Sequence, residues 1–119
     1  MNTLENNLIV LNDISLLEKN WNHNNAPAFS SELIQRVKRI IKKLKNQPDI
    51  FPTAEESIQL EYTNNNGDYL EYEIFEDGHI QKFFSDYFDN DYSVYNIKEE
   101  DINDEEISNF LNSGKNNEN

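Results

Sequence analysis

Residues 58–84 read IQLEYTNNNGDYLEYEIFEDGHIQKFF, a run in which apolar and polar side chains alternate on both sides of two glycines, Gly67 and Gly78. Alternation with a period of two is typical of strands that bury one face and expose the other. Each glycine lies in a short polar segment between two such runs. The sequence therefore predicts a three-stranded antiparallel meander with two tight turns.

The first turn determines which residues face each other. A two-residue loop at Asn66-Gly67 would place Tyr62 opposite Glu71, with apolar and acidic side chains on the same face. A three-residue loop, 65–67, places Tyr62 opposite Leu70 instead, and one face of the hairpin then stays apolar. We therefore expect the three-residue loop.

The second turn gives the same answer. A three-residue loop, 76–78, pairs Ile74 with Ile80 and leaves glycine in the third position, where this type of hairpin requires left-handed backbone. The inward face of the meander is then expected to consist of Ile58, Leu60, Tyr62, Leu70, Tyr72, Ile74, Ile80 and Phe84.

Helical patterns flank the meander. Residues 4–21 carry apolar side chains at spacings of three and four, which indicates one helix or two short ones. Ser30 or Ser31 caps the clearest helix, which carries most of the basic residues. Another short helix is expected at 104–112, with Asn103 as its N-cap. The predicted fold class is α+β, with two or three N-terminal helices packed on a three-stranded antiparallel meander.

The composition limits the classes of function. A length of 119 residues supports one domain, expected at 1–85, with 86–119 as an acidic extension. The chain has no cysteine and only two histidines, which excludes disulfides, thiolate catalysis and cysteine-ligated zinc. No apolar stretch approaches the ~20 residues of a membrane-spanning helix, and the polar start lacks the basic region of a signal peptide. We expect a cytoplasmic protein, in the host cell if the gene belongs to a phage.

Charge is distributed unevenly along the chain. Residues 1–50 hold 5 acids and 7 bases, whereas residues 51–119 hold 18 acids and 3 bases. The net charge of −13 opposes direct binding to nucleic acid phosphates. An acidic block repels itself, so it is either a solvated flank or a surface for a cationic partner.

The outward face of the predicted sheet is the candidate partner-binding surface. The register places Glu61 opposite Glu71, with Glu73 two residues along, and like charges directly opposed are destabilising. Exposed aromatic side chains share this face, so a basic partner with apolar spots would explain both features. Alternatively, the acidic C-terminal segment folds over the face, or the charges are simply tolerated. The candidate partner-binding residues are Glu61, Tyr69, Glu71, Glu73, Phe75, Phe83, Asp86, Asp89, Asp91, Glu99, Glu100, Asp101, Asp104, Glu105 and Glu106.

Paired carboxylates can also perform acid–base chemistry or hold a divalent metal. Here they have no histidine, phosphate-binding glycine loop or nucleophile near them in the predicted sheet. We therefore expect no enzymatic activity, no cofactor and no metal site.

Several short motifs follow each other along the chain: Asn20-Trp21, Ala26-Pro27, Ser30-Ser31, Pro52-Thr53, Gln59-Leu60-Glu61-Tyr62 and Leu70-Glu71-Tyr72-Glu73-Ile74. In these motifs the chain resembles a family of short, poorly characterised bacterial and mobile-element proteins. The resemblance covers about residues 15–84 and implies a fold but no catalytic residues. Such proteins tend to accompany toxin or defence modules and phages, which implies binding and inhibition.

Together these features favour a non-enzymatic acidic inhibitor that binds a basic, nucleic-acid-handling protein, a nuclease or a toxin, as a phosphate mimic. Such a protein would be a phage anti-defence factor, for example an anti-CRISPR, or an antitoxin. The alternative is a structural or accessory protein of a mobile element whose acidic tail confers solubility.

Overall fold

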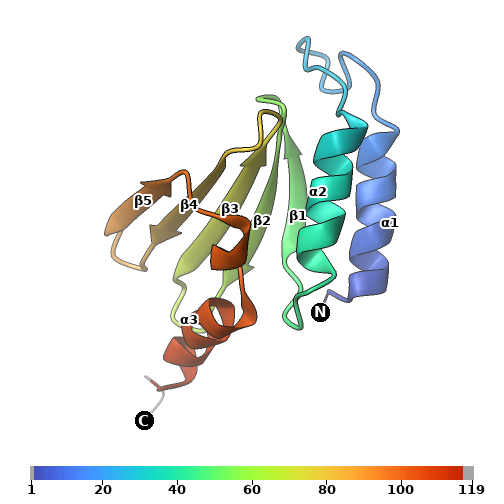
Figure 1. Ribbon diagram of the computed structural model, residues 1–119. Helices are drawn as coiled ribbons and strands as arrows, with labels where there is room; N and C mark the ends of the chain where they lie inside the picture. The colour runs from blue at the N-terminus through green and yellow to red at the C-terminus, as the bar shows by residue number, and fades with distance from the viewer. Residues whose placement is uncertain (1, 117–119) are drawn as a thin grey trace.

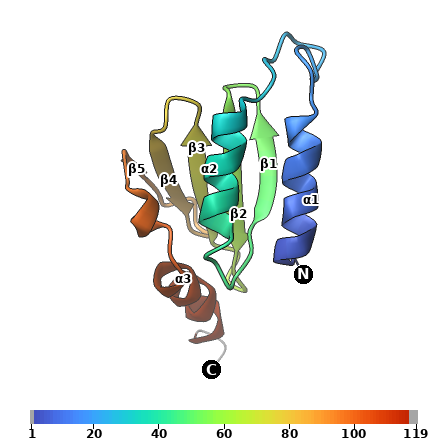
Figure 2. The same ribbon diagram turned by 45° about the vertical axis from the view of Figure 1, so that its right-hand side comes forward.

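The chain folds as a five-stranded antiparallel sheet with helices packed against it (Figures 1 and 2). The computed structural model describes residues 2–116. Its elements are α1 (Leu4–Ser15), α2 (Ser31–Ile41), β1 (Asp49–Thr53), β2 (Ser57–Thr63), β3 (Tyr69–Phe75), β4 (Ile80–Ser85), β5 (Asp91–Tyr95), the 3-10 helix η1 (Glu99–Asp101) and α3 (Asp104–Asn116). The strands lie side by side in chain order, so the α+β class is confirmed.

All four hairpins of the sheet turn in the same way. Each has a three-residue loop whose third residue has positive φ, and these residues are Glu56, Gly67, Gly78 and Asp89, spaced eleven apart. Because each loop adds the same number of residues, the alternation stays in phase along the whole sheet. In the five strands between residues 49 and 95, even-numbered side chains face the helices and odd-numbered ones face away.

The predicted register of the central strands is confirmed. Tyr62 lies opposite Leu70, and Ile74 lies opposite Ile80. The loop 65–67 is closed by a hydrogen bond from the Asn64 N–H to the Asp68 carbonyl (3.1 Å). The equivalent bond at the next loop runs from the Phe75 N–H to the His79 carbonyl (3.0 Å).

The predicted number of strands is wrong, because β1 and β5 extend the expected meander on both sides. The loops that join them to the sheet carry Glu56 and Asp89 at the left-handed position, so no glycine marks either turn. β1 also contains Pro52, a residue that is depleted in strands. The expected boundary at residue 85 falls at the end of β4, inside the β4–β5 hairpin, and β5 is part of the same sheet.

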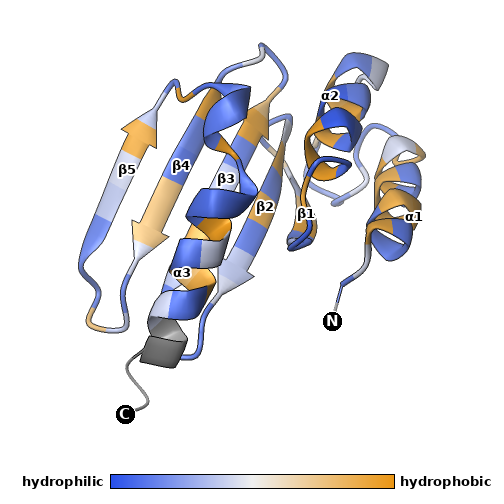
Figure 3. Cartoon of the chain, turned by 60° about the horizontal axis from the view of Figure 1, so that its bottom comes forward, coloured by the Kyte–Doolittle hydropathy of each residue, from blue (hydrophilic) through white to orange (hydrophobic). Residues whose placement is uncertain are grey.

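The helices cover one face of the sheet and leave the other face bare. α2 packs on the sheet, α1 packs against α2 and β1, and α3 crosses the same face near β3 and β4 (Figure 3). Ile102 and Ile107 belong to the same hydrophobic core as the sheet. The segment after β5 is therefore an integral part of the fold.

The helix ends agree with the predicted caps. The Ser30 hydroxyl accepts from the Leu33 N–H (3.1 Å) at the start of α2. The Asn103 side chain accepts from the Glu106 N–H (2.9 Å) at the start of α3, which runs to Asn116 and not to residue 112.

The N-terminal helical pattern forms one helix and not two. α1 ends at Ser15, and the chain then runs without a helix to residue 30. Three residues of this loop, Asn20, His23 and Asn25, have positive φ, a conformation that breaks a helix and that asparagine adopts readily. Within residues 2–116, no helix has the length and apolar character needed to cross a bilayer.

Candidate functional site

The bare face of the sheet, here called the open face, is formed by the odd-numbered side chains of β1–β5. Along β3 the burial alternates between buried and half-buried residues, and the half-buried ones lie on the open face. Between positions 49 and 95 the chain has one lysine, Lys82, and no arginine, and Lys82 has an even number and faces the helices. The open face of the sheet therefore carries acids and no lysine or arginine.

Four carboxylates gather on β1, β2 and β3, and we call them the carboxylate row. Asp49, Glu61 and Glu71 lie directly opposite one another on neighbouring strands, and Glu73 follows Glu71 on the same face. Neighbouring strands are ~4.8 Å apart, and alternate residues on one strand are separated by ~6.8 Å. The sheet therefore holds four acidic groups at short, regular spacings.

Within the described part of the chain, the groups that donate hydrogen bonds to the two glutamates of β3 are neutral. The Tyr69 hydroxyl donates to Glu71 Oε1 (2.6 Å). Glu73 accepts from the Ser57 hydroxyl (2.5 Å) and from the Gln59 amide (3.2 Å). The ion pairs within residues 2–116 lie elsewhere and join Arg39 to Glu99, His79 to Asp77 and Lys82 to Glu106.

The pKa values of two carboxyl groups in this row are raised. Partial burial raises the pKa of Glu61, and the negative charges of Glu71 and Asp49 raise it further. Partial burial also raises the pKa of Glu71, with a smaller contribution from Glu73. The Tyr69 hydroxyl opposes both shifts, because its hydrogen bonds favour the ionised carboxylates.

Aromatic rings flank the carboxylate row. The rings of Tyr69 and Phe83 lie 6.1 Å apart between centroids, and Phe75 stacks on His79 at 4.1 Å. Phe51 of β1 is 48% exposed. The open face thus combines negative charge with aromatic side chains. The six residues expected on it, Glu61, Tyr69, Glu71, Glu73, Phe75 and Phe83, all lie there, but the aromatic ones are half-buried and not exposed as the sequence suggested.

The other predicted acids do not join the carboxylate row. Asp86 and Asp89 lie in the turn between β4 and β5, and Asp91 lies on the open face but at the outer strand β5, with β4 between it and the row. The Asp86 carboxylate accepts from the side chain and the backbone of Asn90 and from the Phe88 N–H, and these bonds hold the pKa of Asp86 below its usual value.

The acids after residue 98 lie on the side of the helices. Glu99 pairs with Arg39, and Asp101 accepts from the Lys98 N–H (2.9 Å). Asp104 accepts from the Lys45 N–H (2.9 Å). This segment therefore does not fold over the open face, which was one of the alternatives considered from the sequence.

Glu106 makes the deepest of these contacts. It accepts hydrogen bonds from the Tyr72 hydroxyl and from Lys82 Nζ, the latter at 2.8 Å. Glu100 and Glu105 remain exposed on the same side of the molecule. Four of the six predicted acids in this segment thus bind their own chain, and two are free to meet solvent.

The structure adds two residues that sequence analysis missed, Asp49 and Phe51. Both lie on β1, whose short alternation ends at Pro52. The alternation of Ile50 with its two neighbours was the available signal, but it spans too few residues to be distinguished from a loop.

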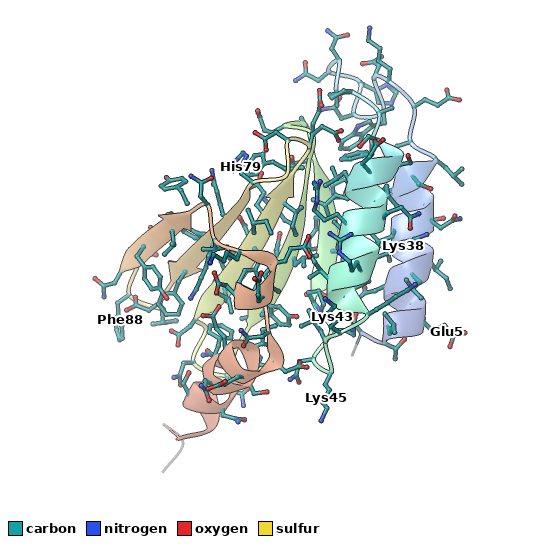
Figure 4. All side chains as sticks on the ribbon, viewed as in Figure 1. Glu5, Lys38, Lys43, Lys45, His79 and Phe88 are labelled. Atoms are coloured by element: carbon teal, nitrogen blue, oxygen red, sulfur yellow. The ribbon has the colours of Figure 1, made fainter. Side chains whose placement is uncertain are left out.

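The helix side of the molecule carries charges of both signs. The lysines labelled in Figure 4, Lys38, Lys43 and Lys45, lie on or just after α2. The acids after residue 98 lie on this side as well, whereas the open face carries acids and no lysine or arginine.

The acidic side chains of the open face can attract cationic groups. Among residues 2–116 no cluster of three or more histidine, aspartate or glutamate side chains is arranged to hold a metal ion. Comparison of the chain with protein-family models, curated proteins and solved structures finds no match.

Proposed function

We propose that the chain is a non-enzymatic inhibitor whose open face occupies the nucleic-acid site of a basic protein in place of phosphate groups. The partner would be a nuclease or a toxin, and the biological role would be that of a phage anti-defence factor, such as an anti-CRISPR, or of an antitoxin. The observation that carries the proposal is the carboxylate row, which crosses three strands and forms no ion pair with any residue of the described range 2–116.

The energetics of the row support a partner with positive charge. Like charges opposed on neighbouring strands destabilise a sheet. Partial burial is the main cause of the raised pKa of Glu61 and of Glu71, and acidic neighbours add to it: Glu71 and Asp49 for Glu61, and Glu73 for Glu71. Arginine or lysine side chains from a partner would relieve the repulsion. The aromatic rings beside the row are of the kind enriched at protein interfaces.

The contacts of the C-terminal acids narrow the proposed site. Four of these acids have structural contacts with groups of their own chain: Glu99, Asp101, Asp104 and Glu106. We therefore assign the partner contact to the carboxylate row and its aromatic neighbours. This assignment also weakens the alternative of a purely solubilising acidic tail, because most of the acids in that segment have structural contacts.

Charge reversal with a matched control tests the proposal. The pair Glu61→Lys and Glu71→Lys changes the open face, whereas Glu100→Lys and Glu105→Lys changes exposed positions on the helix side, and both variants carry the same net charge. Glu73 is left intact because it accepts a hydrogen bond from the buried Ser57. Circular dichroism would verify that each variant is folded.

The readout is cleavage of DNA or RNA by purified nucleases of bacterial defence systems and by nuclease toxins. Wild-type protein and the helix-side variant should inhibit a susceptible enzyme equally, whereas the open-face variant should lose inhibition. Inhibition should weaken as salt rises, and duplex DNA should compete with the protein. Equal inhibition by both variants would show that the open face is not the contact surface.

A further inference from the structure

The β4–β5 hairpin carries an unusual concentration of exposed apolar side chains. Of the eight large hydrophobic residues that are exposed within residues 2–116, five lie between positions 87 and 95. They are Tyr87, Phe88, Tyr92, Val94 and Tyr95. Phe88 is 80% exposed and projects from the outer end of the hairpin (Figure 4). Every residue of β5 is exposed, so no described segment covers the outer edge of the strand.

The hydrogen bond that closes the hairpin before β5 defines which backbone groups face outward. The Asp86 N–H donates to the Asn90 carbonyl (3.1 Å), which places the even-numbered residues of β5 in the bonded positions toward β4. Beyond the end of β5, where Asn96 has positive φ, the Ile97 N–H donates to the Ile80 carbonyl (3.0 Å), one residue out of this alternation. In an antiparallel ladder the bonded residues alternate, so Tyr92 and Val94 bond to β4. The N–H and C=O groups of the other three residues, Asp91, Ser93 and Tyr95, point to the free edge.

The opposite edge of the sheet is protected. The same alternation makes Ile50 and Pro52 the outward residues of β1, and proline has no N–H to donate. At the start of this strand, the Asn7 side chain of α1 donates to the Pro48 carbonyl (2.9 Å). Natural sheets commonly protect their edges in such ways, and the edge of β5 has no proline, lysine or covering helix.

We propose that the edge of β5 pairs antiparallel with β5 of a second copy, with the twofold axis beside Ser93. In this register all three outward residues of each strand meet outward residues of the other. Asp91 then lies opposite Tyr95 of the other copy, and Ser93 lies opposite itself. On the helix side, Tyr92 meets Val94, so apolar side chains face each other across the junction and no two acids are directly opposed.

The net charge of −13 sets the behaviour of this dimer. Two acidic copies repel each other at long range, whereas the strand contact itself contains one charged residue per copy, Asp91. Salt should therefore strengthen the dimer by screening the repulsion. Salt should instead weaken the inhibitor complex proposed above. The two proposals can therefore be tested independently of each other.

Analytical ultracentrifugation of the full chain tests the dimer directly. The weight-average mass should rise with protein concentration, and it should rise further between about 0.1 M and about 1 M salt, where the Debye length falls from ~10 Å to ~3 Å. Ser93→Pro removes the central outward N–H without touching a bond to β4 and should weaken the dimer about tenfold or more, whereas Ser93→Thr keeps the N–H and should dimerise like wild type. Circular dichroism would establish that the proline variant retains its sheet.

Crosslinking provides a second measurement that does not depend on dimer strength. The chain has no cysteine, so a single introduced cysteine reports one position. Cα atoms of a bonded antiparallel pair are ~5.5 Å apart, which fits a disulfide, so Ser93→Cys should form a covalent dimer under mild oxidation. Glu105→Cys, exposed on α3, is the matched control and should remain monomeric. A wild-type chain that stays monomeric at every salt concentration, with equal crosslinking of the two cysteine variants, would overturn the proposal.

Discussion

Glu61 and Glu71 lie directly opposite each other on β2 and β3, and neither takes part in an ion pair within residues 2–116. Each carboxylate has its pKa raised by partial burial and by acidic neighbours. The fold therefore retains a repulsive pair that a neutral side chain would remove. This relationship makes the stability of the protein dependent on pH in a defined direction.

Replacing Glu71 by glutamine should stabilise the protein at neutral pH. A carboxyl group with a higher pKa in the folded state favours folding while it is protonated, and this contribution is lost as pH rises through the folded-state pKa. Glutamine keeps the neutral form and can still accept from the Tyr69 hydroxyl. We expect a gain of up to about 1 kcal/mol at pH 7, since solvent screens these half-exposed groups.

Urea unfolding of Glu71→Gln and wild type between pH 7 and pH 4 would measure this effect. The difference between the two proteins should shrink as pH falls towards the ordinary glutamate pKa of ~4.3. Glu105→Gln, at an exposed position on α3, is the control and should change little. A loss of stability in Glu71→Gln at neutral pH would contradict the expected repulsion.

The turn glycine Gly78 should tolerate asparagine better than valine. Its φ is +98°, a conformation that a β-branched residue adopts only with strain. A Cβ atom at this position would have ordinary contacts with the Arg36 guanidinium, 3.5 Å away, so backbone strain and not a steric clash sets the cost. Gly78→Val should lose about 1–2 kcal/mol, and Gly78→Asn should lose less. Equal thermal unfolding of the two variants would argue against the left-handed turn.

Asp104 and Glu105 are adjacent acids at the start of α3, and we expect them to differ in their effect on stability. Asp104 accepts from the backbone N–H groups of Lys45 (2.9 Å) and Asn46 (3.3 Å), whereas Glu105 is exposed. Both carboxylates lie in the first turn of α3 and interact favourably with the helix dipole to a similar degree. The difference between the losses of stability in Asp104→Ala and Glu105→Ala therefore measures the contact with the loop after α2. Chemical unfolding should show a loss of about 1 kcal/mol more for Asp104→Ala.

The central part of the fold could be predicted from the sequence because local chemistry and burial agree there. Gly67 and Gly78 mark their turns, and the apolar face selects a single register for the strands around them. The Ser30 and Asn103 caps were recognisable for the same reason, since each precedes a helical pattern. Where a turn or cap residue and the burial pattern indicate the same structure, the sequence pattern is enough to predict that structure.

The outer strands could not be predicted because the residues at the left-handed positions of their turns are not glycine, the residue that usually marks such a position in a sequence. Glu56 and Asp89 adopt positive φ because the neighbouring strands pair, and this is a tertiary effect. The acidic face was predicted in its centre, but Asp49 depends on β1 and was missed. The C-terminal acids looked like one charged surface in the sequence, yet contacts with Arg39, Lys82 and the loop after α2 separate them from the open face.

The equal spacing of the four turns also constrains how the gene can change. In the strands between 49 and 95, an odd or even residue number decides which face of the sheet a side chain occupies, so the phase of the alternation is shared by all five strands. Deleting or inserting one residue in any of these loops would transfer the following strands' apolar side chains to solvent and their acids to the core, unless the turn absorbed it as a bulge. Insertions and deletions that the fold accepts in these loops should therefore add or remove an even number of residues, because an even number leaves each strand with the same face toward the helices.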